Sequence, residues 1–396
     1  MRPELRLASR SPPRRRRVIT MPPPDLPDNH PLRVNDRPDF EIGPRTVRVV
    51  DLFSGCGGLT LGVAQAAHEH GWATEVALAV DADMIAAAVY QANFPKAAVQ
   101  AIPVESIFDG NLGCPHTASE QKCRDGMGRI EVLVGGPPCQ GHSNLNNHTR
   151  RNDPKNALYL RMIRAAEVLK PAVILVENVP AVRNDKGDVV GIARTHLGRL
   201  GYQVGEMIVR LDCLGVPQKR QRHVLLATGT DLANPDGVFL RLIQHKHRIR
   251  DLRWAIGDLT AISNRTEPDL APSASAANAS RMAHLLRNDI YDLPNHLRPP
   301  CHQDEHSYKS MYGRLRWDEP AQTITRGFTS IGQGRYMHPD QPRALTVHEA
   351  ARIQGFPDYF DFMATNRRTA LATMIGNAAP PHLAKEIIGA ALFQSA

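Results

Sequence analysis

The sequence predicts an α/β fold in which a mostly parallel, doubly wound sheet is joined by a smaller, irregular domain. Short apolar segments such as VRVVDLF at 47–53 alternate with helix-like segments such as LTLGVAQAAHEHG, which ends at Gly71. This alternation is typical of parallel strands that are covered by helices on both faces. From residue 230 to about 315 the alternation stops and polar and basic clusters replace it. The second pattern predicts a separate domain.

The remaining strands are predicted in order along the chain as EVALAVDAD, IEVLVGGPPC, AVILVEN and RHVLLAT, each with polar residues at its C-terminal end. Because ligands bind at the carboxyl ends of strands in such sheets, we expect the functional residues there. Helical patterning returns at LTVHEAARIQGF and PPHLAKEIIGAALF. We therefore expect a disordered basic and proline-rich tail at 1–45, a catalytic domain at 46–229 plus 344–396, and a small domain at 230–343.

Bulk properties narrow the class of protein. The chain has 396 residues and 42% hydrophobic residues, enough to bury a substantial core. It has neither a long apolar run nor a secretory signal, so we expect a cytoplasmic protein without membrane segments. The six scattered cysteines predict free thiols rather than disulfides. The net charge of +8 favours a partner that carries phosphates.

A glycine-rich turn, DLFSGCGG at 51–58, follows the first predicted strand. Gly55, Gly57 and Gly58 allow the backbone to approach a ligand closely where the strand passes into a helix. The spacing is FxGxGG, whereas dinucleotide-binding enzymes use GxGxxG. Asp81 ends the second strand and is suitably placed to accept hydrogen bonds from ribose hydroxyls. A nucleoside-bearing cofactor is favoured, and a tight turn without a ligand is the alternative.

Cys139 lies in GGPPCQGHS, directly after a predicted strand. The preceding Gly-Gly-Pro-Pro does not favour a helix or strand in which Cys139 would be buried. A nucleophilic thiolate is therefore favoured over a small buried hydrophobic side chain. Cys114, His116 and Cys123 could suggest a metal, but their irregular spacing favours a loop insertion. We therefore expect no metal.

Charged residues mark two further strand ends. Glu177 ends the apolar strand AVILVEN, where a carboxyl must be paired or protonated. A protonated carboxyl there could donate to a ring nitrogen, and a structural ion pair is the alternative. In QKRQR, strand alternation places Gln218, Arg220 and Arg222 on one face. Two guanidinium groups would then face a thiolate or a phosphate, unless the run is a solvated loop.

Taken together, these segments resemble the C5-cytosine-specific DNA methyltransferases of the bacterial restriction-modification or Dcm type. The resemblance runs from Val47 to the C-terminus and rests on seven motifs in the family's order: DLFSGCGG, GGPPCQGHS, ENV, QKRQR, WDEPAQTIT, LTVHEAARIQGFP and GNAAPP. It implies a Rossmann-like, S-adenosyl-L-methionine-dependent methyltransferase domain, with residues 230–343 as a target-recognition domain. It also implies methyl transfer to C5 of a flipped-out cytosine in a specific double-stranded DNA sequence.

The resemblance assigns roles to individual residues. Cys139 would add to C6 of the base, and Glu177 would hold N3. Arg222 would contact the O2 side, and Arg220 would orient the loop. The residues expected to face DNA are Gln140, Ser143 and Gln218. Those expected to hold the cofactor are Phe53, Gly55, Gly57, Asp81, Pro138, Leu158, Asn377 and Ala378.

Two positions depart from the family's pattern. The family usually has glutamate at the position of Asp81, and the shorter carboxylate keeps the same acceptor role. The acidic residue that grips the adenine amino group has no clear match in QAIPVESIF, and Glu105 is our substitute. The family also implies a monomer that acts on nucleoid DNA in the cytoplasm, with a cognate restriction endonuclease acting separately.

Three alternatives remain. A tRNA cytosine-C5 methyltransferase shares a similar motif set, but the long stretch between QKRQR and WDEPAQTIT favours a domain that reads the DNA major groove. A catalytically silent DNA-binding regulator is opposed by the intact Cys139, Glu177 and Arg222. A nicotinamide dehydrogenase is disfavoured by the FxGxGG spacing.

Overall fold

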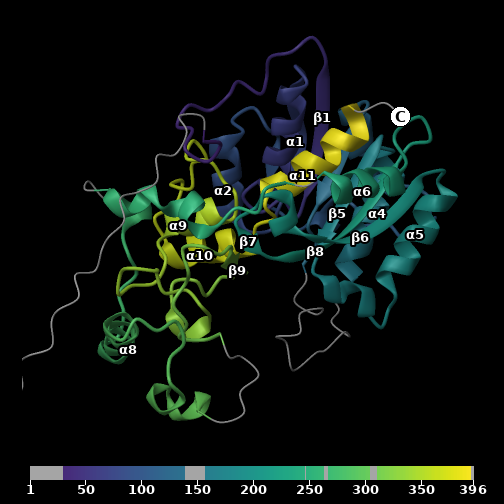
Figure 1. Cartoon of the computed structure of the whole chain (residues 1–396). Coiled ribbons are helices and arrows are strands. Elements are labelled where there is room, and N and C mark those ends of the chain that lie inside the picture. Colours follow the sequence, from purple (N-terminus) through teal and green to yellow (C-terminus); the bar gives the residue numbers. More distant parts are fainter. Residues whose placement is uncertain (1–29, 139–156, 246, 263–265, 304–309, 394–396) are drawn as a thin grey trace, which may run out of the picture.

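The computed structural model describes residues 30–138, 157–245, 247–262, 266–303 and 310–393. Its centre is a seven-stranded sheet with the strand order β3-β2-β1-β4-β5-β8-β6 (Figure 1). The strands are β1 (Thr46–Leu52), β2 (Ala73–Val80), β3 (Val99–Gln100), β4 (Val132–Gly135), β5 (Val173–Asn178), β6 (Gln203–Arg210) and β8 (Gln221–Thr228). The pairs among β1 to β5 are all parallel, so the predicted mostly parallel sheet is confirmed.

Strand β8 runs antiparallel to both of its neighbours, β5 and β6. It follows β6 through residues 211–220, which hold only the short 3-10 helix η4 (Leu211–Leu214) and the two-residue strand β7 (Gln218–Lys219), and a parallel return would need a longer crossover. The expectation that this strand presents its C-terminal end to the binding edge is therefore wrong. Its amino end lies there, because His223 pairs with Asn178 at the carboxyl end of β5.

Helices cover both faces of the sheet. On one face α1 (Gly58–Glu69), α6 (Pro235–Gln244) and α11 (Pro381–Ile388) pack on alternate strand residues such as Val49 and Val134. On the other face α3 (Ala118–Met127), α4 (Tyr159–Leu169) and α5 (Val189–Arg199) pack on their neighbours, such as Val50 and Leu133. The alternation of side chains along each strand thus builds two separate apolar layers.

A third apolar cluster lies beside the sheet. It joins α2 (Met84–Asn93) to α7 (Leu252–Ile256), α9 (Val347–Ile353) and α10 (Arg368–Asn377). A short parallel pair between β7 (Gln218–Lys219) and β9 (Ala321–Gln322) adds to this region. Among the described helices, none combines the length and the apolar character that a membrane span requires.

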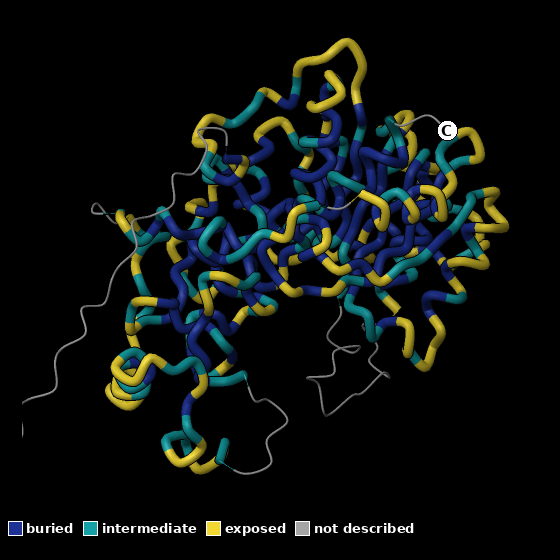
Figure 2. Tube along the Cα trace, viewed as in Figure 1, coloured by how far each residue is buried: buried dark blue, intermediate teal, exposed yellow. Residues whose placement is uncertain are grey.

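The smaller lobe contains α8 (Ala276–Arg287) and has a small core of its own, formed by Met282, Leu285, Leu293, Ile331 and Met337 among others. Figure 2 shows that buried residues concentrate around the sheet, while this lobe is largely exposed or half-buried. Its expected start at residue 230 is too early. Val238 and Phe239 of α6 pack against the sheet, and Leu252 and Ile256 of α7 belong to the third cluster.

The expected disordered tail also needs correction over residues 30–45. Phe40 is buried, and the backbone carbonyls of Leu32 and Val34 accept hydrogen bonds from Asp358 and Tyr359. The segment has no periodic pattern because it packs as an irregular strap rather than as a helix or strand. Residues 1–29 lie outside the described residues.

Candidate active site

The glycine-rich turn after β1 is tightly constrained. Phe53, Gly55 and Gly57 have φ values of 55°, 52° and 95°, in a region of backbone conformation that residues other than glycine rarely adopt. A Cβ on Gly57 would lie 3.0 Å from the rings of Tyr90 and Phe94. The turn therefore has one backbone path, and strain at the non-glycine residue Phe53 marks it as a functional candidate.

The C-terminal segment meets this turn. A Cβ on Gly58 would lie 2.3 Å from the carbonyl oxygen of Ala379, so only glycine permits the contact. The contact brings the end of α10 to the turn, where Asn377 is exposed and Ala378 is buried. Helix α11 then packs along α1. The turn after β1 and the segment after α10 thus meet at the predicted cofactor site.

Asp81 connects the second strand to the glycine turn. One carboxylate oxygen accepts from the backbone N–H of Gly55 and the other from that of Asp83, both at 2.8 Å. Burial raises the pKa of Asp81, and these two hydrogen bonds counteract the shift. Each oxygen keeps one acceptor site, and the buried hydroxyl of Ser54 has no hydrogen-bond partner. Asp81 and Ser54 therefore fit a ligand that carries hydroxyl groups, such as the ribose of S-adenosylmethionine.

Asp51, the last residue but one of β1, is a polar group that we did not single out from the sequence. It is fully buried, accepts a hydrogen bond from the Thr60 hydroxyl at 2.7 Å, and leaves its other oxygen without a partner. Tyr90 in turn donates to Thr60. Burial raises the pKa of Asp51 to about 8. The signal was present in the sequence as the one acidic residue inside the apolar run VRVVDLF.

The other expected cofactor residues vary in position. Glu105 is exposed on the 3-10 helix η1 (Val104–Ser106), whose inward-facing residue is Val104. Pro138 and Leu158 are half-buried and flank residues 139–156, which lie outside the described residues. Cys139, Gln140 and Ser143 fall in that range, so their expected roles stay predictions.

Glu177 and Arg222 form an ion pair at the carboxyl edge of the sheet, between Nε of the arginine and Oε1 of the glutamate. Both side chains are 11% exposed, so the pair is largely shielded from water. Burial raises the pKa of Glu177, and the charge and hydrogen bond of Arg222 oppose the rise. Burial thus favours the protonated carboxyl, and Arg222 favours the charged one.

The backbone that leads to Cys139 lies next to this pair. The side-chain amide of Asn178 donates to the carbonyl of Pro137 at 3.2 Å. A Cβ on Gly136 would lie 3.2 Å from Oε2 of Glu177, so glycine allows the close approach. Gly136 and Pro137 therefore lie beside Glu177 and Asn178, and Cys139, two positions further along the chain, lies outside the described residues.

Gln218 and Arg220 do not face an anion, contrary to expectation. The Gln218 amide donates to Gln354 and accepts from the backbone of Ile324, at 2.8 Å each, and is fully buried. The Arg220 guanidinium donates to the carbonyls of Ile324 and Gly376. Alternation does place both on one face, but that face is covered by residues 324–376. Gln218 leaves no exposed group for DNA, and the buried Arg220 guanidinium contacts backbone carbonyls instead of an anion.

Cys114 and His116 lie in the loop before α3, Cys123 lies within that helix, and a buried ion pair holds the loop. Arg164 of α4 contacts both carboxylate oxygens of Glu120, at 2.8 and 2.6 Å, and donates to the carbonyls of Cys114 and Pro115. In the part of the chain that the structure describes, Cys114, His116 and Cys123 do not form a group with metal-ligand spacing. The loop's conformation is thus explained by Arg164.

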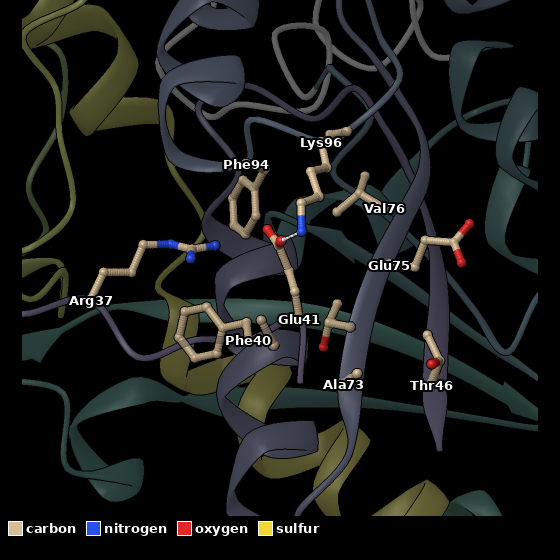
Figure 3. Close-up of a pocket in the computed structure, with 12 residues that line it drawn as sticks. Arg37, Phe40, Glu41, Thr46, Ala73, Glu75, Val76, Phe94 and Lys96 are labelled. Carbon is tan, nitrogen blue, oxygen red and sulfur yellow. Dashed lines mark ion pairs between the residues drawn. The ribbon is translucent and has the colours of Figure 1, made fainter. Parts of the chain in front are cut away.

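A cavity of about 220 Å³ lies elsewhere, lined by Arg37, Phe40 and Phe94 together with the ion pair of Lys96 and Glu41 (Figure 3). It borders the first residues of β2, whereas Asp81 follows the last. The cavity is therefore at the opposite end of that strand from the predicted cofactor site.

The fold and the two adjacent sites define a methyltransferase of the Rossmann-like class. The model of the family "C-5 cytosine-specific DNA methylase" matches residues 47–392, so the chain belongs to this family of S-adenosylmethionine-dependent enzymes. It is 41% identical to the type II methyltransferase M1.BsuMI of Bacillus subtilis, over 91% of this chain and 83% of that protein. It is 31% identical to the type II methylase M.HgiDII of Herpetosiphon aurantiacus, over 86% and 93%.

Solved structures support the same fold. The crystal structure of the Dnmt2 methyltransferase of S. pombe aligns with a TM-score of 0.60 at 18% identity, over 86% of this chain and 97% of that one. The predicted family, fold class and enzyme class are confirmed.

Proposed function

We propose that the chain transfers a methyl group from S-adenosylmethionine to C5 of a flipped-out cytosine within a specific double-stranded DNA sequence, through a covalent bond between Cys139 and C6. One observation carries the proposal: the Glu177–Arg222 pair is held at the carboxyl edge of the sheet beside the Gly136–Pro138 backbone that leads to Cys139. A nucleophile, a protonatable carboxyl and a guanidinium are the groups that activate a pyrimidine ring.

The cofactor would bind at the glycine turn. Asp81 would accept from the ribose hydroxyls, and Phe53, Gly55 and Gly57 would line the approach, with Asn377 and Ala378 closing the site from the C-terminal segment. Pro138 and Leu158 would contact it from the nucleophile loop and from the start of α4. The bound cofactor supplies an electrophilic methyl group. Glu105 would contact the adenine amino group. This role rests on the family resemblance, and the exposed position of the side chain adds no support for it.

The protein residues make the base reactive. Cys139, as thiolate, forms a bond to C6, and the electron pair of the C5–C6 double bond moves toward N3. Protonated Glu177 donates a hydrogen bond to N3 and stabilises the charge that develops there, so C5 gains carbanion character. Arg222 holds the O2 side and limits the pKa rise of Glu177. C5 would then form a bond to the methyl group, and the electrons of the S–CH3 bond would stay on the cofactor's sulfur. A general base would next remove the C5 proton, the C5–C6 double bond would re-form, and the C6–S bond would break to return the Cys139 thiolate.

Arg220 and Gln218 would act indirectly. By holding residues 324 and 376 they fix the junction between the sheet and the segment that carries Asn377. The small lobe, with its exposed surface, would recognise the DNA sequence, together with Gln140 and Ser143 of the nucleophile loop. The type II names of the relatives support a further proposal, a separate restriction endonuclease of matching specificity. We propose a monomer that works on nucleoid DNA in the cytoplasm.

The test is methyl transfer by the purified protein from labelled S-adenosylmethionine to genomic DNA and, in parallel, to total tRNA. We expect incorporation into DNA, with bisulfite sequencing placing the label at one recurring sequence. Cys139→Ala should remove incorporation while DNA binding persists. Incorporation into tRNA alone would replace the substrate, and binding without turnover by the wild type would favour a silent regulator.

A further inference from the structure

A cluster of metal-ligating side chains lies outside the active site. His382 and Glu386 are one helical turn apart on α11, and His247 comes from the segment that follows α6. Their ligand atoms all lie within 4.8 Å of one another, and all three residues are half-buried. Nothing in the proposed reaction uses them. Among the described residues, these three side chains form the one cluster whose spacing could hold a metal ion.

Each imidazole lies about one tetrahedral edge from one of the two oxygens of the Glu386 carboxylate. Nε2 of His247 lies 3.3 Å from Oε2 of Glu386, and Nε2 of His382 lies 3.4 Å from Oε1 of the same carboxylate. Ligand bonds of about 2.0–2.1 Å arranged as a tetrahedron give edges of about 3.3–3.4 Å. Two imidazoles and one carboxylate are a donor set that suits zinc and its neighbours in the first transition series.

Two contacts distinguish the cluster from a simple ion-pair network. Nε2 of His247 is buried and has no hydrogen-bond partner, although the Glu386 carboxylate is near enough to accept. His382 is hydrogen-bonded to the backbone of Leu214, the kind of outer contact that orients a metal-binding imidazole. An unpartnered nitrogen and an oriented ring are what a metal ion would complete.

We propose that His247, His382 and Glu386 form a binding site for a divalent transition-metal ion of the zinc type. The three ligands leave at least one coordination position for water or for His245, whose ring centroid lies 4.4 Å from that of His247. The ion joins α11 to residues 247–251, which lead from the region after α6 to α7. Its role is structural, because it fixes that segment to the catalytic region.

The test uses the untagged full-length chain, since an affinity tag of histidines would bind the same ions. Zn²⁺ is added, excess ion is removed by gel filtration, and retained zinc is measured per chain. Because the six cysteines can also hold zinc, the deciding value is the difference between proteins. We expect wild type to retain one ion more than His382→Ala or Glu386→Gln, and zinc affinity at this site to fall about 100-fold or more in the variants.

The matched control is His296→Ala, which removes an exposed histidine from the small lobe. It should retain as much zinc as wild type. Glu386→Gln keeps the shape of the side chain, so its result holds even if His382→Ala folds poorly. Equal zinc retention by wild type and Glu386→Gln would overturn the proposal, as would a wild type that retains none.

Limited trypsin digestion gives an independent readout. The exposed Arg248 and the half-buried Arg250 lie just beyond His247 and offer cleavage sites. We expect Zn²⁺ to slow cleavage there in wild type and in His296→Ala, but not in Glu386→Gln. Protection that is identical in all three proteins would show that the ion acts elsewhere and would contradict the proposed site. Neither experiment depends on methyltransferase activity.

Discussion

Arg222 reaches Glu177 because the two strands that carry them run in opposite directions. His223 of β8 pairs with Asn178 of β5, so the first residues of one strand lie beside the last residues of the other. A parallel β8 would place Arg222 at the far edge of the sheet. The antiparallel strand therefore supplies the charge partner that the buried carboxyl needs.

Glu177→Gln should lower kcat by about 100-fold or more, because the amide cannot supply the charged and protonated forms that stabilise developing charge at N3. DNA binding should change little, since in the proposed role Glu177 contacts the flipped base and not the DNA backbone. Single-turnover methylation with pre-bound DNA measures the chemical step. Wild-type rates in this variant would remove Glu177 from the reaction.

Arg222→Gln should change how stability depends on pH. When folding raises the pKa of a carboxyl, the free energy of unfolding falls as pH rises. The fall begins near the pKa of the unfolded state, about 4.3, and is complete above the pKa of the folded state. Without Arg222 the pKa of Glu177 rises further, so this loss extends to higher pH. Urea unfolding at a series of pH values measures it. The double variant with Glu177→Gln should lack the added dependence, and its persistence there would assign it to another group.

Asp81→Asn should weaken S-adenosylmethionine binding by about 10- to 100-fold, because hydrogen bonds to a charged acceptor contribute about 1.5–3 kcal/mol. The amide can still accept from Gly55, so the turn should keep its path. Calorimetric titration of the cofactor measures the change, with thermal unfolding as the control for folding. Unchanged affinity would place the ribose elsewhere.

Gly58→Ala should destabilise the protein by at least about 1–3 kcal/mol and abolish cofactor binding, because its Cβ would overlap the carbonyl of Ala379. Gly126→Ala is the matched control. That glycine is inside α3 with nothing within 4 Å of an added Cβ, so alanine there should stabilise by about 0.5–1 kcal/mol. Equal effects of the two substitutions would refute the close contact.

Glu120→Gln should destabilise by about 3 kcal/mol or more at neutral pH, because it leaves Arg164 buried without its main partner. Burial alone would raise the pKa of Glu120, but hydrogen bonds from Arg164 and from the backbone of Thr117 and Gly110 outweigh it and lower the pKa to about 2. The difference in the free energy of unfolding between wild type and Glu120→Gln is therefore complete above about pH 4.3, and it shrinks as pH falls toward 2. A gap that is constant down to pH 3 would contradict this.

The sequence was informative wherever local pattern decides structure. The apolar strands, the glycine turn, Asp81 and Glu177 could all be placed at one edge, because strand ends and positive-φ glycines leave local signatures. Phe53 and Gly57 at the turn have the backbone conformations that such a motif requires. These features depend on neighbours in the chain.

What the sequence could not supply depends on distant contacts. Alternation correctly grouped Gln218 with Arg220, yet nothing local indicates that Ile324 and Gln354 cover that face. Residues 30–45 have no period, so their packing through Phe40 was invisible. The grouping of His247 with His382 joins residues 135 positions apart, which only the fold brings together.

The most direct test of the central claim is covalent trapping on DNA that carries 5-fluorocytosine at the methylated position. Fluorine at C5 cannot leave as a proton would, so the bond between Cys139 and C6 persists after methyl transfer. We predict one denaturation-resistant protein–DNA complex that requires both S-adenosylmethionine and Cys139. A complex of equal yield with Cys139→Ala, or none with a wild type that methylates the same sequence, would contradict the account.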